Sequence, residues 1–332
     1  MKEKYFKYVL LSLVIVLGWV IISGLWPFVN GLLGAFTLYV LVRGQMKTLT
    51  EKRKMNKTSA ALLIITEVIV IVFLPLYLVV WALVHKIQLI NFDISQLVAT
   101  VEHFISLIQD KTGYDILSVG NLETAAGYLS KGVQVIISQI GGIVVTTIVT
   151  AFLLFFMLRD REKLEEYIYK TLPFSELNKV KIRSEIYNMV RSNAIGIPLL
   201  AIIQGVIAVI GYLIAGVPSA MLFGVATAFA TLIPVVGTGI VWLPLCIYLA
   251  MTGHWVSAII LAAWCALLLV NVDNLARLLI QRKLSDTHPL ITVFGVILGL
   301  KLFGFWGIIF GPLLISLFFL LLNIFYKEIN NE

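Results

Sequence analysis

The amino-acid sequence predicts an all-α, polytopic membrane protein with about eight membrane segments, and it does so on three observations. Of the 332 residues, 60% are hydrophobic and 13% are charged, against roughly 45–50% and about 25% in an ordinary soluble domain. Between Arg191 and Asp273, 81 consecutive residues include no Lys, Arg, Asp or Glu. A crossing needs about 20 apolar residues. The apolar runs are also continuous, which indicates helices rather than alternating strands.

The first 84 residues are expected to form three transmembrane helices. Residues 8–42 are uncharged, and Trp26-Pro27 near their middle predicts two helices joined by a tight turn. Residues 43–57 form a loop with six Lys or Arg against one acid, and the next apolar run, residues 58–84, is interrupted only by Glu67. The basic N-terminal flank has no clear cleavage site, so the first run is interpreted as a membrane helix.

Residues 85–131 differ in kind, because they carry five acidic residues and three Lys. Helical apolar spacing and an Asp-x-x-Gln pattern from Asp93 to Gln96 predict a small extracytoplasmic helical insertion. Residues 132–158 form the fourth predicted span. Residues 159–193 are charged and predict cytoplasmic helices, which Pro173 should divide.

The orientation follows from the distribution of basic residues. Alternating the predicted spans places both termini and the basic loops on one side, with 21 of the 25 Lys and Arg residues. The positive-inside rule makes this side cytoplasmic. The chain is therefore expected to be a multi-pass protein with cytoplasmic N- and C-termini.

Residues 194–326 form the predicted transport core, which contains two broken hairpins at 218–252 and 289–323. In the first, residues 233–239 separate pieces that each reach only about 21 Å, short of the roughly 30 Å hydrocarbon core. The second is broken at residues 301–304. Re-entrant half-helices are the natural interpretation of both.

The two hairpins also resemble each other. Residues 239–245 and 307–313 share the pattern Gly-Ile-aliphatic-aromatic-x-Pro-Leu, and the predicted orientation makes the hairpins an inverted repeat. Paired short segments interrupted by Gly and Pro indicate a transporter's binding site. The alternative is that Gly and Pro only allow kinks and close helix packing.

Burying a charged side chain in a membrane costs free energy, so each such residue is expected to have a specific partner or function. Asp273 lies four residues before Arg277, so it is either a coupling carboxylate or half of an interfacial ion pair. Glu67 is a second possible coupling carboxylate, or a structural hydrogen-bonding group. Lys301 either contacts an anionic substrate or extends to the interface. Gln204 either binds a hydroxylated ligand or bridges two helices.

These considerations give a set of candidate substrate- or ion-binding residues in the predicted core. The set comprises Gln204, Pro234, Gly237, Gly239, Asn271, Asp273, Asn274, Arg277, Gly307, Gly311 and Pro312. Cys246 and Cys265 lie in apolar runs, and the four His residues lack metal-ligand spacing, so no metal site or cofactor is expected.

Several motifs in order resemble the autoinducer-2 exporter family of permease-like bacterial proteins. They are Gln204-Gly205, Ile233-Pro234-Val235-Val236-Gly237, Trp242-Leu243-Pro244, Asp273-Asn274-Leu275-Ala276-Arg277, His288-Pro289-Leu290 and the run from Gly304 to Pro312. The resemblance is dense over residues 190–325 and mainly topological before them. One departure is Leu278, where family members often have proline.

This resemblance implies a bacterial inner-membrane transporter with an extracytoplasmic insertion, and it makes a homo-oligomer plausible. Family members are associated with autoinducer-2 export in quorum sensing, and others with sodium(lithium)/proton antiport. The expected partners are thus the lipid bilayer, a small polar solute, and H+ or Na+. The basic residues do not form a nucleic-acid-binding patch.

The leading functional prediction is an ion-coupled secondary transporter that works by alternating access. The alternatives are a sodium(lithium)/proton antiporter, and a passive channel or membrane scaffold. No Gly-x-x-x-x-Gly-Lys-Ser/Thr loop is present to bind ATP, and neither paired membrane aspartates nor a His-Glu-x-x-His motif is present. An enzyme is therefore not expected.

Overall fold

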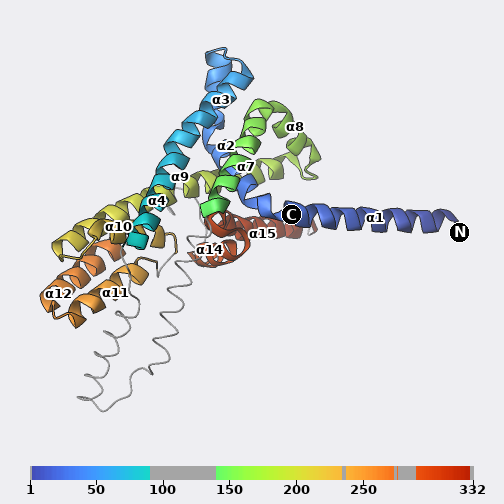
Figure 1. Ribbon diagram of the computed structural model, residues 1–332. Coiled ribbons are helices and arrows are strands. Elements are labelled where there is room, and N and C mark those ends of the chain that lie inside the picture. The colour runs from blue at the N-terminus through green and yellow to red at the C-terminus, as the bar shows by residue number, and fades with distance from the viewer. Residues whose placement is uncertain (1, 90–139, 234–236, 273–274, 276–288, 330–332) are drawn as a thin grey trace.

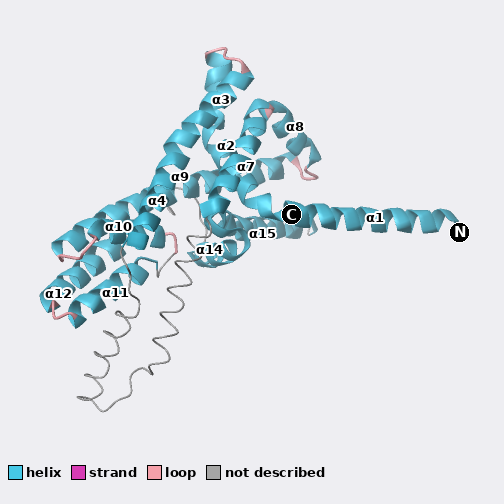
Figure 2. Ribbon diagram, in the orientation of Figure 1, coloured by secondary structure: helices cyan, strands magenta, loops and turns pink. Residues whose placement is uncertain are grey.

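The protein is helical throughout the part that the computed structural model describes, which is residues 2–89, 140–233, 237–272, 275 and 289–329. Within these residues, short loops connect the helices and no strand occurs (Figure 2). Five helical stretches are long and apolar enough to cross a membrane, and three shorter apolar helices accompany them. The predicted all-α, polytopic membrane fold is confirmed.

The N-terminal helix stands apart from the rest of the molecule. Helix α1 (Lys2–Leu25) joins α2 (Val29–Lys47) through a 3-10 turn, η1 (Trp26–Phe28), at the predicted Trp-Pro position. Figure 1 shows α1 projecting away from the other helices. Its large apolar side chains from Phe6 to Leu25 are exposed, so the helix body has no packing partner among the described residues.

Helices α2, α3 and α7 form the first core cluster. Helix α2 continues through a π-helical turn, η2 (Thr48–Lys52), and α3 (Lys57–Val68) begins at Asn56, whose side chain accepts a hydrogen bond from the Thr58 amide. Leu38, Ile64 and Leu154, one from each helix with α7 spanning Ile140–Arg159, are 3% exposed or less.

A second π-helical turn, η3 (Ile69–Phe73), connects α3 to α4 (Leu74–Leu89). It ends two residues before Pro75, which lacks an N–H group and so leaves an earlier carbonyl without its usual donor. Residues 90–131 of the predicted insertion lie outside the described part of the chain.

Helices α8 (Arg161–Thr171) and α9 (Glu176–Ile214) follow, and the break between them contains Pro173, as predicted. Ser175 begins α9 by accepting a hydrogen bond from the Asn178 amide at 3.4 Å. Helix α9 is continuous over 39 residues, or about 58 Å, and has no break at residue 193, where the cytoplasmic segment was predicted to end.

The first predicted hairpin is formed by α10 (Ala220–Ala230) and α11 (Gly237–Met251). Helix α12 (Trp255–Trp264) and the π-helical turn η4 (Cys265–Leu269) then return along α9. Figure 1 shows these helices together at one end of the molecule. Their core includes Tyr212 from α9, Leu245 from α11 and Leu261 from α12.

The second predicted hairpin is formed by α14 (Pro289–Phe303) and α15 (Gly307–Ile329). The 3-10 turn η5 (Gly304–Trp306) connects them, and Gly304 has a positive φ of 54° that favours glycine. This hairpin packs through Ile309, Phe310 and Leu313 on Val190 of α9 and Val40 of α2. The predicted break at residues 301–304 coincides with this turn only at Gly304, because residues 301–303 still belong to α14. In the first hairpin, residues 237–239 of the predicted break 233–239 already belong to α11, and residues 234–236 lie outside the described part of the chain.

Candidate transport site

A buried polar group fixes the first hairpin to α9. Gln204 of α9 is completely buried, and its side-chain oxygen accepts a hydrogen bond of 2.6 Å from the hydroxyl of Thr231. Thr231 is the C-cap of α10 and directly precedes the interruption of the hairpin. The predicted residue Gln204 therefore lies beside the broken backbone of the first hairpin.

The same α9–α10 interface contains further buried hydroxyls. The Tyr212 and Thr227 hydroxyls are 2.8 Å apart, and both side chains are completely buried. Thr231 and Thr227 are four residues apart, and the Thr231 hydroxyl contacts the Thr227 carbonyl at 2.9 Å. Together Gln204, Thr231, Thr227 and Tyr212 form what we call the polar row.

Two indole groups border this region. The Trp264 Nε1 group donates to the Ile207 carbonyl of α9 at 3.0 Å. The Trp242 Nε1 atom of α11 is buried and has no hydrogen-bond partner among the described residues. An unsatisfied buried donor is costly, so the first hairpin retains one polar group available to a ligand.

The predicted glycines of the first hairpin have different surroundings. Gly237, at the start of α11, lies so close to the Ala230 carbonyl that an added methyl group would overlap it. A methyl group at Gly239 would meet only the Leu243 side chain, at 3.7 Å. Gly237 thus permits a close backbone approach, whereas Gly239 is not required for packing.

The second hairpin is built on four glycines. Gly295 and Gly299 of α14 face Gly307 and Gly311 of α15, and a methyl group on any of them would overlap backbone of the other helix. Pro312 belongs to the same crossing, since its Cα would lie 2.5 Å from a methyl group at Gly295. The predicted residues Gly307, Gly311 and Pro312 are thus brought together by direct backbone contact.

The two hairpins attach to different parts of α9. The first packs near Gln204, whereas Asn193 donates to the Ile309 carbonyl of the second at 3.5 Å. Eleven helical residues separate these levels, which is about 16 Å. The structure therefore brings the predicted residues together as two groups rather than as one site.

Apart from Glu67, the other predicted residues are either exposed or outside the described part of the chain. Asn271 is exposed, and its amide donates to the Leu267 carbonyl of its own helix at 2.7 Å. Lys301 is exposed in the last turn of α14. Four predicted residues lie outside the described part of the chain, namely Pro234, Asp273, Asn274 and Arg277.

Glu67, the second predicted coupling carboxylate, is half-buried and accepts a hydrogen bond from the Gln45 amide group. Because α2 and α3 form a hairpin, this contact places Glu67 level with the charged end of α2, between Arg43 and Lys47. Glu67 therefore lies beside the basic C-terminal end of α2.

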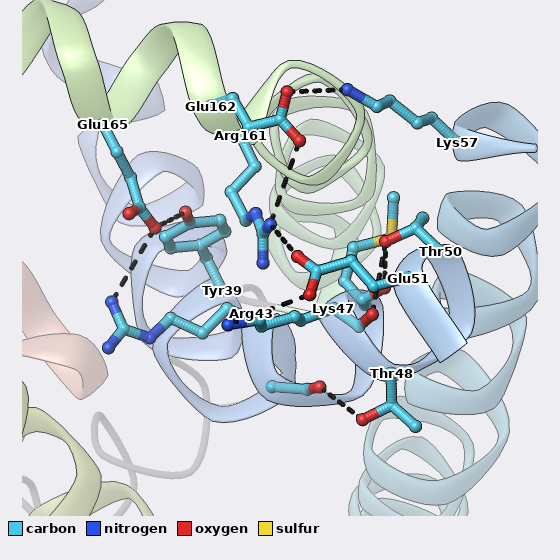
Figure 3. Close-up of polar contacts among 12 residues, drawn as sticks. Tyr39, Arg43, Lys47, Thr48, Thr50, Glu51, Lys57, Arg161, Glu162 and Glu165 are labelled. Carbon is cyan, nitrogen blue, oxygen red and sulfur yellow. Dashed lines mark hydrogen bonds and ion pairs between the residues drawn. The ribbon is translucent and has the colours of Figure 1, made fainter. Parts of the chain in front are cut away.

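A network of charged groups connects α2, α8 and α9, and Figure 3 shows its members on α2 and α8. The Tyr39 hydroxyl donates to Glu165 at 2.6 Å, and the same carboxylate pairs with Arg183 at 3.0 Å and Arg43 at 3.8 Å. The Arg43 guanidinium also lies 4.5 Å from the centre of the Tyr187 ring. Glu165 therefore holds three helices together at this end of the molecule.

The α2–α3 connection joins the network through two further ion pairs. Arg161 pairs with Glu51 at 3.4 Å and Lys57 with Glu162 at 2.9 Å (Figure 3). The hydrogen bond from Lys57 lowers the pKa of Glu162 from its ordinary value. These mostly exposed pairs stabilise little individually, but they orient α8 against the α2–α3 hairpin.

Sequence reasoning missed several of these groups. The spacing of Thr227 and Thr231, four residues apart in an apolar helix, was an available signal for the polar row. Ser316 was a separate signal of a polar contact, because it is an isolated hydroxyl in a long apolar run. The Glu165 network had no local signal, because Tyr39 and Glu165 are 126 residues apart in sequence.

The arrangement can bind polar groups through neutral donors and acceptors next to broken helices. The described residues contain no cluster of three or more His, Cys, Asp or Glu side chains that could hold a metal ion. Backbone groups at helix breaks and buried hydroxyls suit a small hydroxylated solute or a monovalent cation.

Comparison with known proteins gives matches over nearly the whole chain. A family described as "AI-2E family transporter" matches residues 9–327. A protein of Methanocaldococcus jannaschii that is named as a candidate transport protein is 26% identical to this chain. The match covers 98% of this chain and 97% of the length of that protein. A Helicobacter pylori protein with the same provisional name is 29% identical over 87% of each chain.

Proposed function

Because the chain belongs to the family of AI-2E transporters, we propose that it is a secondary transporter that exports a small polar solute by ion-coupled alternating access. Autoinducer-2 is the leading candidate for the solute. The observation that carries this proposal is the hydrogen bond between Gln204 and Thr231, which holds a buried polar side chain against the interruption of the first hairpin.

The polar row supports binding of an uncharged, hydroxyl-rich solute. Its groups are neutral, so they can exchange hydrogen bonds with a ligand without burying an unpaired charge. The Trp242 indole, which has no hydrogen-bond partner in the described part of the chain, supplies one further donor. Transport would alternate between states in which the first hairpin opens and closes against α9, and the solute would bind both states.

The first experiment measures autoinducer-2 inside and outside cells that lack their own exporter, with and without this protein. A Gln204→Leu variant tests the polar row, and Glu166→Gln on the exposed face of α8 serves as the expression control. We expect the internal pool to fall with the wild-type protein and the control but not with Gln204→Leu. An unchanged pool would contradict autoinducer-2 as the solute and make sodium(lithium)/proton exchange the next hypothesis.

Two further sets of variants test the predicted core. We expect Asp273→Asn to abolish ion-coupled transport while the protein still folds, and ion-dependent transport by that variant would exclude the coupling role. Pro234→Ala and Pro312→Ala should each impair transport by straightening a half-helix. Wild-type rates in both variants would remove the support for the hairpins as the transport site.

The surroundings of α1 support an inner-membrane homo-oligomer. Gly18 and Gly24 have no atom within 4 Å of an added methyl group, and the large apolar side chains around them are exposed. Such a helix needs either lipid or a second copy of the chain around it. Cross-linking of single-cysteine variants along α1 in membranes would distinguish the two, because only a second copy gives a dimer that depends on position.

A further inference from the structure

Glu185 is a carboxylate that the predicted transport core did not include. It lies on α9, is half-buried, and accepts a hydrogen bond of 2.7 Å from the hydroxyl of Ser316 on α15. Ser316 itself is only 8% exposed. The contact joins residues that are 131 positions apart in sequence.

The register of the two helices determines what surrounds this carboxylate. Asn193 contacts Ile309, and Glu185 contacts Ser316, so α9 and α15 are antiparallel. Residues 307–326 of α15 include no Asp, Glu, Lys, Arg or His, and Ser316 lies at the middle of that stretch. Glu185 therefore contacts the middle of an uncharged stretch of α15.

Most other acidic side chains that the structure describes have a cationic partner. Glu51, Asp160, Glu162, Glu165, Glu166 and Glu176 each have a Lys or Arg within 4.0 Å. Among the described side chains, only Glu67 and Glu185 contact neutral partners alone. Glu67 lies beside the basic end of α2, whereas Glu185 contacts α15, which is uncharged over residues 307–326.

The charged groups around Glu185 are already engaged or directed elsewhere. Arg183 pairs with Glu165 of α8, and Arg43 of α2 lies over the Tyr187 ring. Lys181, one turn earlier on α9, is exposed and is not within ion-pair distance of Glu185. A half-buried carboxylate beside a hydroxyl group can supply oxygen ligands to a small cation.

We propose that Glu185 and Ser316 form a site for a small monovalent cation, a proton or Na+, that moves with the transported solute. The proposal rests on the proposed function and adds the group that carries the ion. In the ion-free state Glu185 is negative and held by the Ser316 hydroxyl. Binding of the cation neutralises the carboxylate at the α9–α15 contact and so allows α15 to move against α9.

The first test is independent of the solute. The purified full-length protein is treated with dicyclohexylcarbodiimide, which modifies protonated carboxyl groups in apolar surroundings, and the modified residues are located by mass spectrometry. We expect labelling at Glu185 several-fold above that at Glu166, and loss of the label as the pH is raised. Protection by Na+ at constant pH would identify Na+ as the cation, whereas labelling that Na+ does not reduce would identify the proton.

The variants separate this site from other carboxylates. Glu185→Gln should remove the label, Ser316→Ala should change its pH dependence, and the matched variants Glu166→Gln and Glu67→Gln should leave it unchanged. Labelling at Glu185 no greater than at Glu166 would overturn the proposal. So would an identical pH dependence in wild type and Ser316→Ala.

The second test measures coupling in proteoliposomes, with autoinducer-2 as the probe and an imposed H+ or Na+ gradient. We expect Glu185→Gln to retain equilibrating flux but to lose accumulation driven by the gradient. Wild-type accumulation by Glu185→Gln would overturn the cation site. If the wild-type protein moved no autoinducer-2, the proposed solute would fail, and the labelling result would still decide the cation site.

Discussion

The two hairpins have similar sequences but pack in different ways. In the second hairpin, Gly295 and Gly299 contact the backbone of α15, the partner helix of the same hairpin. The sequence Phe-Gly-Val occurs at residues 223–225 and again at residues 294–296. By this match the counterparts in the first hairpin are Gly224 and Ala228, which instead pack on Gly205 of α9. Equivalent small residues thus join the two helices of the second hairpin to each other, whereas in the first hairpin they join α10 to α9.

A single sequence difference accounts for part of this contrast. Gly311 of the second hairpin corresponds to Leu243 of the first, which is 49% exposed. A leucine at this position prevents the close backbone approach that Gly311 allows. The second hairpin is therefore joined by backbone contact along its glycine crossing, whereas the close backbone contact of the first hairpin lies at its interruption, between Gly237 and Ala230.

The largest expected effect tests the glycine crossing. Gly307→Ala should destabilise the protein by about 3 kcal/mol or more, because its methyl group overlaps the Gly299 carbonyl and the two backbones must separate. The matched variant Gly239→Ala, at the equivalent position of the first hairpin, should be close to neutral. Denaturation by SDS in mixed micelles measures both. Equal losses of stability would show that the hairpins pack alike.

A smaller effect is expected where the first hairpin meets α9. Gly205→Ala should cost about 1–2 kcal/mol, because its methyl group would lie 2.9 Å from the Ala228 Cβ and 3.3 Å from the Gly224 carbonyl oxygen. The same denaturation assay applies. Gly44→Ala is the control, since a methyl group there has no neighbour within 4 Å. A neutral Gly205→Ala would contradict the close α9–α10 contact.

The hydrogen bond between Thr231 and Gln204 should contribute less to stability than either of these glycine contacts. Thr231→Val removes the donor to Gln204 while it keeps the side-chain shape, and we expect a loss of about 1 kcal/mol. Thr231→Ser keeps the hydroxyl and should retain most of this contribution. If both variants lost the same stability, the methyl packing of Thr231 would matter rather than its hydroxyl.

The smallest effect concerns the ion pair between Lys57 and Glu162 at the charged end of the molecule. Because Lys57 lowers the pKa of Glu162, the pair stabilises the protein at neutral pH and ceases to do so as the pH falls through that lowered pKa. Both side chains are mostly exposed, so Lys57→Gln should cost at most about 0.5 kcal/mol. Thermal unfolding at several pH and salt values checks this. An undiminished effect at high salt would contradict an exposed ion pair.

The sequence predicted both helix breaks correctly because the residues responsible act locally. Pro173 cannot continue a helix, and Gly304 adopts a positive φ that favours glycine. The Gly-Ile repeat starts at Gly307, the first residue of α15, and at Gly239, two residues after α11 begins. It could not show which neighbour each helix packs against, because a small residue permits close contact with any helix.

By itself, the sequence determined the class of the protein, because apolar content and the length of apolar runs decide whether a helix belongs in a bilayer. Only the tertiary structure decided which polar groups meet. Gln204 and Thr231 are 27 residues apart, and Glu185 and Ser316 are 131 apart. Such pairs depend on the register between helices, which is set by the packing of whole apolar faces and leaves no local pattern in the chain.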